Sequence, residues 1–124
     1  MLQHYVVLKY REGTSDAHVN AFCERMLALR GAIPEIRHME IGRDELHDAR
    51  SWDLVMRMAF ESVNALRAYQ THAAHRAVMA FNDPFVAHVA TVDYEGATAP
   101  EVGPLPEERP VLQSELDFRP ACQV

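Results

Sequence analysis

The spacing of apolar residues switches between a period of two and a helical period within the first 95 residues. The stretches that predict strands are residues 2–10, 35–42, 51–60 and 86–94. Helical spacing follows the first strand, between the capping residue Ser15 and Gly31, and the third strand, over residues 62–79. This order is βαββαβ, which predicts a ferredoxin-like α+β fold with a four-stranded antiparallel sheet. We expect the second helix to break near Thr71.

The first predicted strand carries apolar side chains on both of its faces. Val6 and Leu8 point to one side, and Tyr5 and Val7 point to the other. Both faces of this strand are therefore expected to be covered. Because the helices cover one face, we predict a homodimer in which the open sheet face packs on that of a second copy, giving a dimeric α/β barrel.

The last 29 residues differ in composition from the rest. Five of the seven prolines fall in residues 96–124, so regular structure is expected to be sparse there. The same stretch contains several apolar side chains, among them Val102, Leu105 and Phe118. We therefore predict one domain over residues 1–95 and a tail over residues 96–124 that packs on the domain or on the dimer partner.

The charge and composition of the chain exclude several kinds of partner. The formal net charge is −6 and the twelve basic residues form no run, so neither nucleic acid nor an anionic membrane is expected to bind. The RNP1 pattern of an RNA-recognition domain is missing from the third strand. No apolar run approaches the ~20 residues that span a bilayer. The two widely separated cysteines indicate a reducing, cytoplasmic setting.

One cluster of side chains could carry chemistry. His4 shares the helix-facing side of the first strand, and Tyr69, His72 and His75 follow one another at intervals of three in the second helical stretch. Imidazole exchanges protons near neutral pH, and a neighbouring Tyr hydroxyl can donate a hydrogen bond to a carbonyl or an enolate. The same residues could instead form a structural network that fixes the bend in the helix.

The pair His72 and His75 also resembles part of a metal site. Two imidazoles need a third or fourth ligand, and no cysteine or carboxylate lies nearby in the sequence. We therefore expect neither a metal nor a cofactor.

Four segments resemble the stress-responsive α/β-barrel (Dabb) domain family. They are His4–Lys9, Phe60–Ser62, Tyr69–His75 and Val92–Tyr94, and the resemblance extends over about residues 2–95. It implies the ferredoxin-like fold and a face-to-face homodimer. Ala73 stands where the family commonly has proline.

The resemblance also implies roles for individual residues. In a plant polyketide cyclase of this family, olivetolic acid cyclase, the counterparts of His4, Tyr69 and His75 are the working residues. By that resemblance, His75 is the general acid/base, and Tyr69 orients His75 or the substrate carbonyl. His4, on the first strand, supports these two residues. The other residues expected around a small apolar ligand are His72, Val6, Leu8, Phe22, Met26, Met56, Met58, Val63 and Leu66.

Two functions remain open from the sequence. One is a cofactor-independent enzyme that acts on a small apolar carbonyl compound by proton abstraction or aldol closure. The other is a non-catalytic dimeric stress or ligand-binding protein. A cofactor-free oxygenase has only fold-level analogy as support. A cavity of at least roughly 300 Å³ at His75 would favour an enzyme or a ligand-binding protein.

Overall fold

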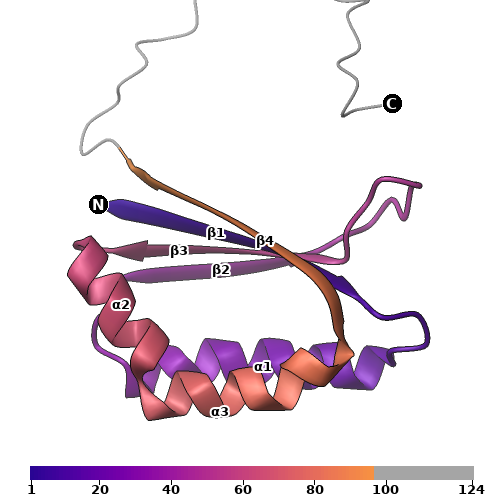
Figure 1. Cartoon of the computed structure of the whole chain (residues 1–124), viewed down its shortest axis with the longest axis horizontal. Helices are drawn as coiled ribbons and strands as arrows, with labels where there is room; N and C mark the ends of the chain where they lie inside the picture. Colours follow the sequence, from indigo (N-terminus) through magenta and orange to yellow (C-terminus); the bar gives the residue numbers. More distant parts are fainter. Residues whose placement is uncertain (97–124) are drawn as a thin grey trace, which may run out of the picture.

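The computed structural model describes residues 1–96 and confirms the βαββαβ order. Three α-helices lie together on one side of a single sheet (Figure 1). The elements in chain order are β1 (Leu2–Tyr10), α1 (Asp16–Ala32), β2 (His38–Arg43), β3 (Leu54–Phe60), α2 (Val63–Thr71), α3 (Ala73–Asn82), the 3₁₀ turn η1 (Asp83–Phe85) and β4 (Val86–Glu95). The predicted tail lies outside the described residues.

The four strands form one antiparallel sheet in the order β2-β3-β1-β4. β1 lies between β3 and β4, so its residues from Leu2 to Leu8 have a neighbour on both sides. His4 lies opposite Met58 of β3 and opposite Asp93 of β4. This register brings residues from both ends of the domain to one position beneath the helices.

The core lies between the sheet and the helices. Every second residue of β1 is buried, as the alternation predicts, while the residues between them are partly exposed. Helix α1 begins after Ser15, whose side chain accepts a hydrogen bond from the backbone N–H of His18. Its buried face carries Val19, Phe22, Met26 and Leu29.

The predicted break in the second helical stretch is confirmed and lies at His72. This residue ends α2 and begins α3, and its Nδ1 accepts a hydrogen bond from the backbone N–H of Ala74 at 3.0 Å. The cap compensates for the helical hydrogen bonds lost at the junction. The bend turns α3 so that it runs beside α1 (Figure 1).

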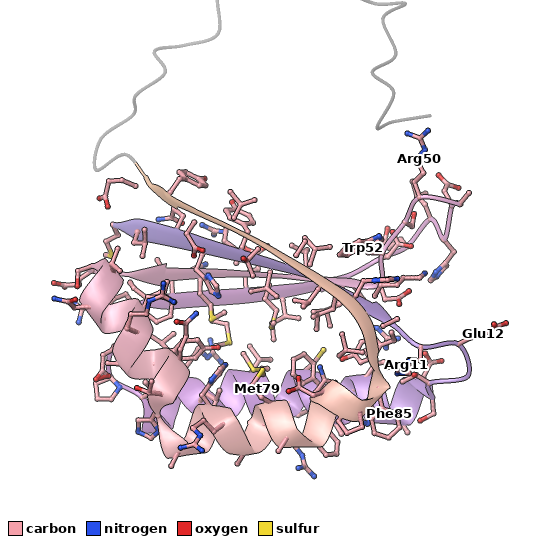
Figure 2. All side chains as sticks on the ribbon, in the orientation of Figure 1. Arg11, Glu12, Arg50, Trp52, Met79 and Phe85 are labelled. Carbon is pink, nitrogen blue, oxygen red and sulfur yellow. The ribbon has the colours of Figure 1, made fainter. Side chains whose placement is uncertain are left out.

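Two strands begin later than the sequence-based prediction, and the first of them is β2, which begins at His38 instead of residue 35. The third strand begins at Leu54 instead of residue 51, because the side chain of Asp53 binds the backbone N–H of Tyr10. Trp52 therefore does not share the buried face of this strand. It lies on the side of the sheet away from the helices, where it stacks on His88 (Figure 2).

The sheet face opposite the helices is uncovered in the described chain. Exposed apolar side chains on this open face come from β3 and β4: Val55, Val92 and Tyr94. Tyr94 also stacks on Tyr5 of β1, with ring centroids 6.0 Å apart. Among residues 1–96, none of the helices is long and apolar enough to cross a membrane.

Candidate functional site

A cavity of about 210 Å³ lies between the sheet and helices α2 and α3. The residues that line it are His4, Val6, Leu8, Phe22, Met56, Tyr69, Gln70, His75, Met79, Asn82, Asp83, Val86, Val89 and Thr91. The three residues predicted as catalytic therefore share one cavity. Its volume is below the roughly 300 Å³ that would favour an enzyme or a ligand-binding protein, so it can hold only a small ligand.

His75 lies in the first turn of α3, and the bend at His72 directs its ring toward Tyr69. The two ring centroids are 4.3 Å apart. The Nδ1 of His75 is 3.1 Å from the backbone carbonyl oxygen of Gln70, which can only accept, so Nδ1 carries the hydrogen. The other nitrogen, Nε2, then holds a lone pair. Burial lowers the pKa of His75, which favours the neutral ring at neutral pH.

Tyr69, near the end of α2, is the buried hydroxyl of the site. Only 2% of the residue is exposed, and its ring packs between Phe60 and His75. Burial raises its pKa, so it stays a protonated hydrogen-bond donor. Within residues 1–96 the structure gives its hydroxyl no protein partner. Because Tyr69 lines the cavity, that hydroxyl can donate to a bound ligand.

The orientation of the His4 ring is fixed by a residue of the neighbouring strand β4. Its Nδ1 forms a short hydrogen bond with the Oδ1 of Asp93. A carboxylate can only accept, so the neutral His4 ring carries its hydrogen on Nδ1 and leaves a lone pair on Nε2. His4 is buried and lines the cavity, with its ring edge against Phe60. The site thus contains two imidazoles with fixed tautomers and one free hydroxyl.

The structure brings together some of the predicted ligand-binding residues and leaves others outside. Val6, Leu8, Phe22 and Met56 form apolar walls of the cavity. The residues in the predicted set that do not line it are His72, Met26, Met58, Val63 and Leu66.

These five residues have other positions for identifiable reasons. His72 uses its ring as a helix cap. Val63 begins α2 on the outer side and is 55% exposed. Met26, Met58 and Leu66 are buried in the core.

Three residues of the site were missed by reasoning from the sequence. Asp93 contacts His4, Gln70 supplies the carbonyl to His75, and Asn82 lines the far part of the cavity. Only Asp93 left a signal, since it is an acidic residue on the same face of the predicted strand as Val89 and Thr91, the face that packs toward the helices. The role of Gln70 rests on its backbone, which sequence does not reveal.

The charge of the cavity wall is low. None of the lining residues is a lysine or an arginine, and Asp83 is the one lining residue that carries a carboxyl group. Among residues 1–96, no group of three His, Cys, Asp or Glu side chains could hold a metal ion. The cavity therefore favours a neutral organic ligand over an anion.

Comparison with known proteins gives relatives that are matched over most of their own length. An uncharacterized protein of Streptomyces coelicolor is 30% identical over 97 residues, which are 77% of this chain and 99% of the relative. A dimeric ferredoxin-like protein of unknown function from Thermobifida fusca has a TM-score of 0.69 at 25% identity, covering 75% of this chain and 88% of that one. A dimeric protein of the same fold from Bacteroides fragilis, also of unknown function, has a TM-score of 0.70 at 26% identity, covering 77% and 95%.

The family match covers the whole described domain. The sequence model of the Stress responsive A/B Barrel Domain (Dabb) matches residues 2–96, from the start of β1 to just past the end of β4. These residues contain every group of the cavity described above. The chain therefore belongs to the stress-responsive A/B barrel domain family.

Proposed function

We propose that the protein catalyses cofactor-independent acid/base chemistry on a small apolar carbonyl compound, with enolate formation as the central step. The observation that carries the proposal is the convergence on one apolar cavity of a protonated, unpaired Tyr69 hydroxyl and the neutral His75 ring. These are the two groups that enolisation needs: a base for the α-carbon and a donor for the carbonyl oxygen.

The proposed step begins with the substrate carbonyl accepting a hydrogen bond from Tyr69. The Nε2 of His75 removes a proton from the adjacent carbon, and the C–H electron pair becomes the enolate π bond. Negative charge collects on the oxygen next to Tyr69, whose raised pKa keeps its proton available. The proton on His75 then returns to carbon, or the enolate attacks a second carbonyl in an aldol closure.

His4 supports this chemistry from β1. The carboxylate of Asp93 fixes the His4 tautomer and stabilises a positive charge if His4 takes a proton. His4 is then a second acceptor or donor for the substrate, on the sheet side of the cavity. The apolar wall of Val6, Leu8 and Met56 would exclude water from the enolate.

A homodimer through the open face is part of the proposal. The solved relatives from Thermobifida fusca and Bacteroides fragilis are described as dimeric. In this chain the open face carries Val55, Val92 and Tyr94 at its exposed positions. Packing this face on a second copy would bury that apolar surface and leave the cavity, which lies on the other side of the sheet, intact.

Deuterium exchange tests the proposed step without knowledge of the natural substrate. Phenylacetone and cyclohexanone are incubated with the full chain in D₂O, and incorporation of deuterium next to the carbonyl is followed by ¹H NMR. We expect the wild type to accelerate exchange, and His75→Gln and Tyr69→Phe each to slow it by about 10²-fold or more. His47→Gln, which changes an exposed histidine in the loop, is the matched control.

A second candidate is a non-catalytic protein, because the cavity volume of about 210 Å³ is below the roughly 300 Å³ that favours an enzyme or a ligand-binding protein. A non-catalytic ligand-binding protein would shift the resonances of Tyr69 and His75 when ligand is added and yet leave exchange at the buffer rate. Exchange that is equally fast in wild type, His75→Gln and Tyr69→Phe would also remove these residues from the chemistry.

A further inference from the structure

The cavity has a second polar end, which the proposed chemistry does not use. His75 and Asn82 are seven residues apart on α3, so they lie on the same helix face two turns apart, about 10 Å along the axis. Met79 lies between them and points into the layer between helices and sheet (Figure 2). All three line the same cavity, so it extends along α3 from the acid/base groups to an amide.

The amide of Asn82 is held in one orientation. Its Oδ1 accepts a hydrogen bond from the hydroxyl of Tyr10 at 2.8 Å and from the Nε2 of His18 at 3.0 Å. The His18 ring is itself fixed between Phe81 and Phe85, with centroids at 4.6 and 3.9 Å. Two donors from β1 and α1 therefore occupy the amide oxygen and turn the NH₂ group away from them.

The NH₂ group of Asn82 is a donor without a partner in the protein. The residue is only 2% exposed, and within residues 1–96 the structure gives Nδ2 no acceptor. It is not sealed in, because the only fully enclosed, unpartnered side-chain nitrogen or oxygen of the described chain is Oε2 of Glu35. The space that Nδ2 reaches is the cavity that Asn82 lines.

We propose that Asn82 is a specificity-determining residue that donates a hydrogen bond to an oxygen acceptor at the far end of an elongated, neutral ligand. The inference rests on the proposed function for the identity of the near end, where His75 and Tyr69 hold the reacting carbonyl. A neutral acceptor fits because the Asp83 carboxylate lines the same end and would repel an anion. A buried donor left unpaired would reject a ligand that is apolar at that end.

A matched pair of probes tests the far end alone. In 4-(methoxymethyl)phenylacetone and 4-propylphenylacetone the enolisable ketone end is the same, and an ether oxygen in one replaces a CH₂ group in the other. Affinities for the full chain are measured by ¹⁵N NMR, following the side-chain amide of Asn82 and the ring of His75. We expect the methoxymethyl compound to bind at least about fivefold more tightly, and only this compound to shift the Asn82 amide strongly.

Two variants separate the donor from the network that holds it. Asn82→Asp keeps an acceptor for Tyr10 and His18 but lacks the NH₂ group, and Asn82→Leu removes both. We expect the preference for the methoxymethyl compound to fall to about onefold in each. If Asn82→Leu fails to fold, the probe preference of Asn82→Asp and the amide shifts of the wild type still test whether Asn82 donates to the ligand.

The outcomes distinguish the two proposals. Equal affinity of the probes for the wild type, with the His75 ring still shifting, would overturn the role of Asn82 and leave the acid/base site in place. A fivefold preference that persists in Asn82→Asp would overturn it as well. Loss of deuterium exchange in His75→Gln, together with the probe preference in the wild type, would support both.

Discussion

His4 on β1 and Asp93 on β4 lie directly opposite each other in the sheet, and the Nδ1 of His4 is hydrogen-bonded to the carboxylate of Asp93. Neighbours in this register are close enough for side chains to interact directly, so the pair needs no change of backbone to form. The carboxylate determines which nitrogen of His4 faces the cavity as an acceptor. Asp93 is thus a positioning residue, and its effect is measurable on the ring itself.

Replacement of Asp93 should change the tautomer of His4. We expect Asp93→Leu to remove the acceptor for Nδ1, so that the Nδ1–H form no longer predominates in ¹H–¹⁵N correlation spectra of the His4 ring. Glu95→Gln is the control, because Glu95 pairs with the exposed N-terminal amine and not with His4. An unchanged His4 tautomer in Asp93→Leu would show that the backbone or another group determines it.

The stability of the domain should depend on the protonation of His75. Burial lowers its pKa in the folded state below the ordinary value of 6.5. Below pH 6.5 the unfolded chain therefore binds more protons at this residue than the folded chain does. The free energy of unfolding should rise with pH between the folded pKa and 6.5 and lose that contribution as the pH falls.

The comparison with His75→Gln isolates this contribution. Urea unfolding of wild type and variant between pH 5 and pH 8 should give a difference that changes with pH below about 6.5 and is constant above it. The lowered pKa also keeps His75 a base at neutral pH, so exchange activity should decline only when the pH falls below the usual histidine range. A pH-independent difference in stability would mean that His75 titrates alike in both states.

His72 should behave as a helix cap and not as a ligand-binding residue. We expect His72→Ala to lower the free energy of unfolding by about 1 kcal/mol, because the backbone N–H of Ala74 loses its acceptor. His72→Asn supplies another side-chain acceptor and should restore most of that loss. Neither variant should alter deuterium exchange by more than about twofold. A large loss of exchange in His72→Asn, with unchanged stability, would place His72 in the chemistry.

The sequence was sufficient to predict the architecture because the architecture depends on local signals. The alternation in β1, the cap at Ser15 and the break beside Thr71 each have a direct physical cause that is visible in the order of residues. The start of β3 was misplaced because Asp53 pairs with Tyr10, a residue 43 positions away. Side-chain contacts between residues so far apart in the chain cannot be recognised from the spacing of apolar residues.

The candidate site was predictable only in part for the same reason. Spacing placed Tyr69 and His75 on one side of a helix, and alternation placed His4 beneath it. Spacing could not show that the ring of His72 caps helix α3 at the bend and therefore does not line the cavity. The position of Asn82 at the far end depends on donors from two other elements, so it required the structure.

The open face offers the last prediction, which concerns assembly. Val92 of β4 lies on this face and is 63% exposed in the single chain. If two copies pack through their open faces, Val92→Glu places an unpaired carboxylate in the apolar interface, which costs several kcal/mol per dimer when no partner compensates it. We expect this variant to be monomeric at micromolar concentration in sedimentation equilibrium, whereas the wild type is dimeric.

The matched control is Val63→Glu, which changes a valine that is 55% exposed on α2, on the helix side of the molecule. It adds the same charge outside the open face, so it should leave the dimer intact. The single-chain fold should survive in both variants, because neither valine belongs to the core between sheet and helices. A dimer that tolerates Val92→Glu and dissociates with Val63→Glu would place the interface on the helices instead, where it would also cover the cavity and require a different account of ligand entry.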